Sequence, residues 1–197
     1  LRVAMSGDQP PFNAVSRDKS VIGFDVDLAQ AIAGAMQVKL EIVQMPFGDL
    51  MSAVEKGKAD MVMSGMAITP SRTQSVSFVG PYMMSGKSMV FGAATQEKVK
   101  TGADLNKADI RLVALKNSTS ESFAERQLPN AKLKTIDNYE DGIKMIMAGD
   151  ADAMVADMPA CKLSVLRNPN AGLATLEEPL SIDEVVANVL TSLRNTE

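Results

Sequence analysis

The chain has 197 residues, of which 46% are hydrophobic and 22% charged, and its formal net charge is −4. This composition is ordinary for a soluble globular protein, and scattered basic residues exclude the concentrated positive charge of a nucleic-acid-binding surface. The chain has no histidine and a single cysteine, Cys161. It therefore lacks the commonest general base and metal ligand and cannot form an intrachain disulfide. Gly-rich phosphate loops and Gly-x-Ser-x-Gly elbows are also missing, so the sequence disfavours metal-dependent and triad enzymes, and we expect no metal and no cofactor.

The first half of the chain reads as strands alternating with helices. We expect Asp25 to cap the first helix, Gly57 to end the second helix, and Thr69 to cap a third helix with Pro70 at its first position. The expected strands and helices are, in order, strand Leu1–Met5, helix Val26–Met36, strand Lys39–Val43, helix Asp49–Lys56 and strand Asp60–Met63.

The second half repeats this order. Ser118 or Thr119 can cap one helix, and Asn138 and Gly149 can begin and end the next. The expected elements are strand Arg111–Leu115, a helix to Gln127, strand Lys132–Ile136, a helix to Ala148 and strand Asp152–Val155. The phrase Gly57-Lys58-Ala59-Asp60 also has a counterpart, Gly149-Asp150-Ala151-Asp152. The fold class is therefore α/β, with two similar βαβαβ lobes, and ligands are expected beyond the carboxyl ends of the strands, in a cleft between the lobes.

Arg72 follows one of these strand ends, in the segment Ser64-Gly65-Met66-Ala67-Ile68-Thr69-Pro70-Ser71-Arg72. A cation in the first turn of a helix is disfavoured by the helix dipole unless it shares an anion with the free N–H groups there. A ligand carboxylate could accept a bidentate pair from Arg72 together with backbone donors. The alternative is an exposed arginine without a ligand.

Other candidates follow the remaining strand ends. Lys116-Asn117-Ser118-Thr119-Ser120 could face the same anion, although Ser/Thr-rich turns are usually only helix caps. Asp157 is a candidate partner for a ligand ammonium, because a carboxylate in a closing cleft is costly unless it is paired. Phe12 and Phe47 could cover an apolar ligand surface or simply pack in the core.

Seven segments occur in a characteristic order and spacing: Pro10-Pro11-Phe12, Gly23-Phe24-Asp25-Val26-Asp27-Leu28, Gly57-Lys58-Ala59-Asp60, Ile68-Thr69-Pro70-Ser71-Arg72, Phe78, Pro81-Tyr82 and Asp152-Ala153-Met154-Val155-Ala156-Asp157. With these segments, the chain from Leu1 to about Leu180 resembles the polar amino-acid solute-binding proteins, which are periplasmic binding proteins of the ABC-transporter type, family 3. It implies a periplasmic-binding-protein-like fold, with lobe I formed by residues 1–86 and 181–197 and lobe II formed by residues 87–180.

The resemblance also implies roles. Arg72 resembles the arginine that binds an α-carboxylate, helped by backbone N–H groups near Gly65 and Ala67, and Thr119 and Ser120 resemble the residues that complete this clasp. Asp157 resembles the acid that takes the α-ammonium. Phe47 resembles an aromatic wall of the pocket, and Lys116 resembles a lysine that reaches the ligand side chain in some members.

Three residues depart from the family pattern. Ala67 stands where many members offer a hydroxyl, and Gln9 stands where many have an aromatic residue that would face Phe47. Ser6 stands where binders of basic amino acids have an aspartate, which argues against Lys, Arg or His as the ligand. The side-chain preference of the site therefore stays open.

The resemblance implies capture of an amino acid or similar small zwitterion by lobe closure, for an ABC permease or for the membrane domain of a sensor kinase. It also implies a non-enzyme in the periplasm or outside the cell, with a lipoprotein anchor as one arrangement. No apolar run approaches the roughly 20 residues of a membrane span, and we expect that a signal peptide has been removed. The alternative is an enzyme on the same scaffold, resembling cyclohexadienyl dehydratases, which would convert prephenate or arogenate into an aromatic product.

The C-terminal segment departs most from the family. We expect a helix from Asp183 to Leu190, with Val186, Val189, Leu190 and Leu193 on one face. This interpretation leaves out the strand with which the family chain returns to lobe I. We therefore expect residues to be missing between Ile182 and Asp183; the alternative is a shortened lobe that lacks this strand.

Overall fold

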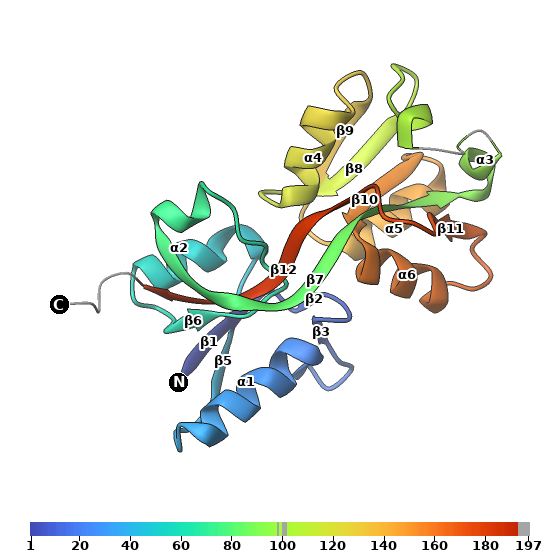
Figure 1. Ribbon diagram of the computed structural model, residues 1–197. Coiled ribbons are helices and arrows are strands. Elements are labelled where there is room, and N and C mark those ends of the chain that lie inside the picture. The colour runs from blue at the N-terminus through green and yellow to red at the C-terminus, as the bar shows by residue number, and fades with distance from the viewer. Residues whose placement is uncertain (98, 100–101, 193–197) are drawn as a thin grey trace. The chain divides into compact units, whose positions relative to one another are not determined.

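The computed structural model describes residues 1–97, 99 and 102–192. The chain divides into two compact units, which we call unit 1, Leu1–Met84 with the described part of Glu184–Glu197, and unit 2, Ser85–Asp183. These boundaries differ by two and three residues from the division at 86/87 and 180/181 expected from the sequence. Strands β7, Val76–Gly92, and β12, Ser181–Ser192, each contribute residues to both units (Figure 1).

Unit 1 is built on a short parallel sheet. Strand β1 pairs in parallel with β5 on one side and β6 on the other, and β12 pairs antiparallel with β6, with Leu190 opposite Val62. The remaining elements of unit 1 are a small antiparallel sheet, two α-helices and two 3-10 helices. The bounds are β1 Arg2–Met5, β2 Asp8–Gln9, β3 Asn13–Val15, β4 Val21–Ile22, α1 Phe24–Ala35, β5 Glu41–Gln44, a 3-10 helix Phe47–Asp49, α2 Leu50–Glu55, β6 Met61–Val62 and a 3-10 helix Arg72–Gln74.

Unit 2 repeats this strand order. Strand β8 pairs in parallel with β9 and β10, and β7 pairs antiparallel with β10, so that β7 takes the place that β12 has in unit 1. Helix α4 packs against β8 and β10. The bounds are α3 Ala93–Gln96, a 3-10 helix Gly102–Leu105, β8 Arg111–Leu115, α4 Thr119–Gln127, β9 Lys132–Ile136, α5 Tyr139–Ala148, β10 Ala153–Asp157, α6 Met158–Arg167 and β11 Leu173–Thr175.

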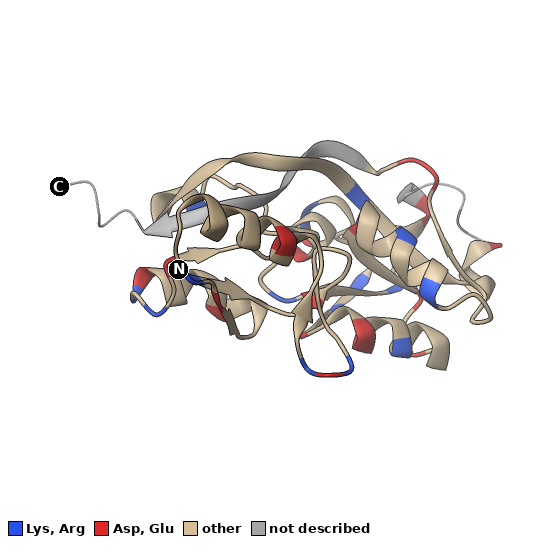
Figure 2. Ribbon diagram, turned by 90° about the horizontal axis from the view of Figure 1, so that it is seen from below, with Lys and Arg blue, Asp and Glu red and all other residues tan. Residues whose placement is uncertain are grey.

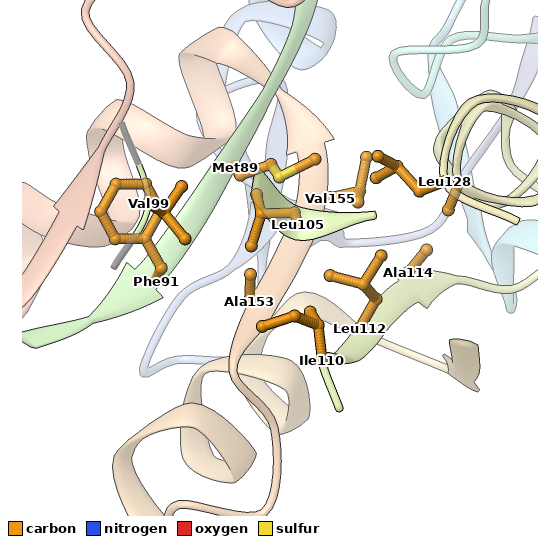
Figure 3. Close-up of a cluster of buried hydrophobic side chains, with 11 residues drawn as sticks. Met89, Phe91, Val99, Leu105, Ile110, Leu112, Ala114, Leu128, Ala153 and Val155 are labelled. Carbon is orange, nitrogen blue, oxygen red and sulfur yellow. The ribbon is translucent and has the colours of Figure 1, made fainter. Parts of the chain in front are cut away.

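Each unit has its own apolar core. In unit 1, Val3, Met5 and Met63 are fully buried against α1 residues such as Ala29. In unit 2, side chains from β7, β8 and β10 meet those of the segments that pack on the sheet (Figure 3). Because full burial of one such side chain stabilises a protein by about 1.5–3 kcal/mol, each sheet is held by the face that it buries. Lysine and arginine are interspersed with aspartate and glutamate on the helices and loops of both units (Figure 2).

The C-terminal segment is a strand, so the predicted helix from Asp183 to Leu190 is wrong. Residues Ser181–Ser192 form β12, the returning strand that the sequence interpretation left out. The segment has helical spacing of apolar residues, but it is also rich in valine, which favours strands, and β6 offers it a partner. The parts of the prediction that concern Leu193 and Glu197 lie outside the described residues.

Two helix starts also differ from expectation. Gly23, with φ 130°, precedes helix α1, and Asp25 lies inside the first turn instead of capping it. After Pro70 there is no α-helix but only the 3-10 helix Arg72–Gln74. In unit 2 the predicted caps are confirmed, because the Ser118 and Asn138 side chains accept hydrogen bonds from the backbone N–H groups of Glu121 and Asp141.

Candidate functional site

Arg72 is held in a defined orientation in unit 1. Its backbone N–H donates to Thr69 Oγ1 at 3.2 Å, and its Nη1 donates to the carbonyl of Ala67 at 2.8 Å. Its guanidinium carbon lies 5.8 Å from the ring centroid of Phe47, within the range of a cation–π contact. The side chain is half-buried, whereas Phe47 and Ala67 are buried. The structure thus brings together three of the predicted site residues, Arg72, Phe47 and Ala67. The hydrogen bond to the Ala67 carbonyl orients the guanidinium.

Gly65, Gln9 and Phe12 form a second contact within unit 1. Gly65 has φ +56°, and a Cβ atom there would lie 2.8 Å from Gln9 Oε1 and 3.2 Å from Phe12 Cδ2, so only glycine fits without a shift. Gln9 and Phe12 are each 3% exposed. Within the described residues, Gln9 Nε2 is buried without a hydrogen-bond partner, which is uncommon for a polar atom in a native protein. The structure thus places Gln9 and Phe12, two predicted site residues, against Gly65.

Asp25 organises the same region, and the sequence interpretation missed it. Its Oδ2 accepts from Asn13 Nδ2 at 2.7 Å, its Oδ1 accepts from the Tyr82 hydroxyl, and its carboxylate also accepts from the backbone N–H of Gly65. Asp25 is fully buried, and this burial raises the pKa of its carboxyl. The burial of Tyr82 and the nearby charge of Asp25 raise the pKa of the Tyr82 hydroxyl. The cluster fixes the backbone at Gly65, beside Gln9 and Phe12. The phrase Gly23-Phe24-Asp25, read as a helix cap, was the available signal.

In unit 2, Asp157 ends β10 opposite Lys87 on β7. Lys87 Nζ donates to Asp157 Oδ1 at 2.6 Å and to Thr119 Oγ1 at 2.7 Å. The Lys87 side chain is 0% exposed and the Asp157 side chain 11% exposed. Asp157 and Thr119 were predicted site residues and are brought together, but Lys87, which joins them, was missed. The sequence indicates this role only weakly, by a single lysine that stands two residues before the apolar run Met89-Val90-Phe91.

The other predicted residues of unit 2 lie differently. Ser120, on α4, is buried, and among the described residues its Oγ has no hydrogen-bond partner. Lys116 is exposed, and its backbone N–H donates to the carbonyl of Ile136. The structure therefore leaves the buried Ser120 Oγ without a hydrogen-bond partner among the described residues, and it does not include Lys116 in the Lys87–Asp157–Thr119 cluster.

Within the described ranges, no three His, Cys, Asp or Glu side chains gather into a metal site. Cys161 is a buried free thiol, and burial raises the pKa of that thiol. Over the same described part of the chain, each helix is too short or too polar to cross a membrane.

Comparison with known proteins assigns the chain to a family. Residues 1–126 match the model of the bacterial extracellular solute-binding proteins, family 3. The chain is 29% identical to ABC transporter arginine-binding protein 1 of Escherichia coli, over 89% of this chain and 70% of the relative. It is 27% identical to the cyclohexadienyl dehydratase of Pseudomonas aeruginosa, over 93% and 69% of the two chains.

Among solved structures, the chain is similar to a putative binding component of an ABC transporter from Wolinella succinogenes, complexed with lysine. The TM-score is 0.93 at 31% identity, and the match covers 100% of this chain and 84% of the other. Both the match to the family model and this agreement in fold extend over more than half of the chain. The chain therefore belongs to the bacterial extracellular solute-binding proteins of family 3.

Proposed function

We propose that the protein binds an amino acid or a similar small molecule with a carboxylate group, for uptake by an ABC transporter or for sensing. Membership of an extracellular family supports this function and a location outside the cytoplasm. Relatives whose names include arginine-binding and histidine-binding support an amino acid as the ligand. An ABC permease or the membrane domain of a sensor kinase is the proposed partner.

Arg72 is the residue that we propose to hold the ligand carboxylate. The observation that carries this role is the orientation of its guanidinium by the Ala67 carbonyl and the Phe47 ring. A planar guanidinium whose direction is fixed in advance loses little conformational entropy when it binds a carboxylate through paired hydrogen bonds. Gln9 and Phe12 at Gly65, with Phe47, are proposed to contact the rest of the ligand.

In unit 2, Thr119, Ser120 and Asp157 are proposed to be ligand-binding residues. The buried Ser120 Oγ without a partner supports this role, because a ligand oxygen or N–H group would satisfy it. The role of Lys116, which is exposed, stays a prediction from the family resemblance.

A thermal-shift screen of the twenty amino acids tests the function. A ligand at 100 times its Kd stabilises the folded protein by about 2.7 kcal/mol, which is an easily measured shift. Arg72→Ala is expected to weaken binding of the best ligand by at least about 2–3 kcal/mol, because the ligand carboxylate loses its charged partner. Arg72→Lys is expected to retain only weak binding, because lysine cannot replace the planar bidentate guanidinium. The matched control is Arg17→Ala, at an exposed arginine of unit 1. Undiminished affinity of the Arg72→Ala variant in calorimetry would remove Arg72 from the site.

An enzyme on this scaffold is the second candidate function, and the similarity to cyclohexadienyl dehydratase over 93% of the chain favours it. Incubation with prephenate or arogenate separates the two functions. Binding without turnover is the expected result, and an aromatic product would show that the protein is an enzyme.

A further inference from the structure

Gln9 carries a carboxamide that is buried in unit 1. The residue is 3% exposed, and its Nε2 has no hydrogen-bond partner among the described residues. A buried N–H group without an acceptor loses its hydration and gains nothing in return, and native proteins hold few such groups. A buried donor that finds no acceptor in its own protein is therefore a candidate to meet one on a bound ligand.

Gln9 borders the same short segment that orients Arg72. Gly65, with φ +56°, leaves room for the Gln9 amide, because a Cβ atom there would lie 2.8 Å from Gln9 Oε1. Two residues further along the chain, the Ala67 carbonyl accepts from Arg72 Nη1 at 2.8 Å. Two residues of chain span at most about 7 Å, so these two contacts lie near each other. All four residues belong to unit 1, and one small ligand can thus meet Arg72 with its carboxylate and Gln9 with its side chain.

The hydrogen-bonding capacity of the Gln9 amide selects the end of the ligand side chain. Nε2 donates and Oε1 accepts, and a ligand carboxamide pairs with both ends, because its oxygen accepts from Nε2 while its own N–H donates to Oε1. This reciprocal pair forms equally well with either end of the Gln9 amide turned toward the ligand oxygen.

Other side chains satisfy Gln9 less well. The ammonium of lysine and the guanidinium of arginine are donors only, so they leave Nε2 without an acceptor. A carboxylate accepts from Nε2 but has no N–H for Oε1, and its charge is costly to bury. An apolar side chain leaves both ends of the Gln9 amide without a partner.

We infer that Gln9 is a specificity-determining residue, and that the ligand is an amino acid whose side chain ends in a carboxamide, namely L-glutamine or L-asparagine. This inference rests on the proposed function, in which Arg72 binds the ligand carboxylate. It also explains one departure from the family pattern, because the aromatic residue that many members have at this position could not form the two hydrogen bonds.

Calorimetry with the twenty amino acids tests this inference on the unchanged protein. The decisive comparisons are glutamine with glutamate and methionine, and asparagine with aspartate and leucine, which have similar size but lack the carboxamide. Whichever amide binds better is expected to have the lowest Kd of all twenty, by about tenfold or more over its matched acid and its apolar match. A smaller margin, or tighter binding of an amino acid without a carboxamide, would overturn the inference.

The variant Gln9→Met separates this role from a structural one. It keeps the length of the side chain and removes both hydrogen-bonding ends, so the preference for the amide over its apolar match is expected to fall by about tenfold or more. The control Gln30→Met, at an exposed glutamine of α1, should leave this preference unchanged. A preference that survives in Gln9→Met would contradict the inference. Should this variant not fold, the comparisons on the unchanged protein still decide.

Failure of this inference is distinguishable from failure of the proposed function. If none of the amino acids binds, the proposed function itself fails. If an amino acid binds, and Arg72→Ala weakens it, but the amides have no advantage, the proposed function stands and only the role of Gln9 is refuted.

Discussion

Unit 1 and unit 2 have the same ion pair at the amino ends of their parallel strands. Arg2, the first residue of β1, donates from Nη2 to Asp60 Oδ1 at 2.6 Å, and its backbone N–H donates to Asp60 Oδ2 at 2.7 Å. Arg111, the first residue of β8, makes the same two bonds to Asp152, both at 2.8 Å. In each unit the aspartate stands just before the neighbouring parallel strand, so the pair joins two strands where they begin.

The buried aspartates differ between the units. Asp25 in unit 1 has neutral donors, namely the Tyr82 hydroxyl, the Asn13 amide and the N–H of Gly65. Asp157 in unit 2, at the carboxyl end of β10, has the ammonium of Lys87. Ligands of parallel α/β sheets bind at the carboxyl ends of the strands, and the amino ends mainly stabilise the sheet. The repeated pairs are therefore part of the scaffold, whereas Asp157 lies at the strand end where such sheets bind ligands, and Asp25 lies in the first turn of α1.

The largest expected effect is that of Asp157→Ala. This change removes the Asp157 carboxylate that faces the buried ammonium of Lys87, and the free energy of unfolding is expected to fall by about 3–5 kcal/mol. Urea denaturation followed by circular dichroism measures it. The double variant Lys87→Met with Asp157→Leu, which removes both charges, should lose less than the single variant. A loss below about 1 kcal/mol for Asp157→Ala would mean that the pair is no more costly to break than a surface pair.

The Asp25 cluster is expected to respond to pH. Because burial raises the pKa of Asp25, the native state holds this proton more tightly than the unfolded state does. Its contribution to stability therefore falls as the pH rises from the ordinary carboxyl value of 3.8 through the raised value, and stays low above it. The Asp25→Asn variant has no titrating group at this position. It is expected to lower the free energy of unfolding by about 1–3 kcal/mol at pH 4, because a hydrogen-bond donor is left without an acceptor. This loss should become smaller toward pH 7, where the unchanged protein has itself become less stable. Urea midpoints of both proteins across this range measure the difference, and a cost that grows toward pH 7 would contradict the assignment.

Local sequence patterns predicted the repeated scaffold well. The expected strands Arg111–Leu115 and Lys132–Ile136 have the bounds of β8 and β9, because both are apolar or β-branched runs between clear turn and cap residues. The caps at Ser118 and Asn138 were also predictable, since a cap is a contact within four residues. These features depend on neighbours in the sequence.

The features that failed depend on distant partners. Lys87 pairs with a residue 70 positions away, and a lysine in a strand is ordinarily expected to face solvent. Asp25 resembled a helix cap, and only its contact with Tyr82, 57 positions away, gives it a buried role. The segment Ser181–Ser192 has the apolar spacing of a helix, but pairing with β6 makes it a strand. Of the candidate site, sequence therefore provided the residues at the strand ends but not the charge that compensates Asp157.

The smallest expected effects are those of Asp60→Asn and Asp152→Asn, which break the repeated pairs. The hydrogen bond from Arg2 lowers the pKa of Asp60, so the stabilisation by this carboxylate is present above the ordinary carboxyl pKa and is lost as the pH falls through the lowered value. The Asp60 side chain is 43% exposed, and solvent screens its pair, whereas the Asp152 side chain is 22% exposed. We therefore expect both variants to unfold at lower urea concentrations at pH 7, with the larger shift for Asp152→Asn. The shift of Asp60→Asn is expected to disappear on acidification.

The control for both variants is Asp109→Asn, at an exposed acid of unit 2. A larger shift for Asp60→Asn, or shifts no larger than that of the control, would show that the two pairs do not support the two sheets in the same way.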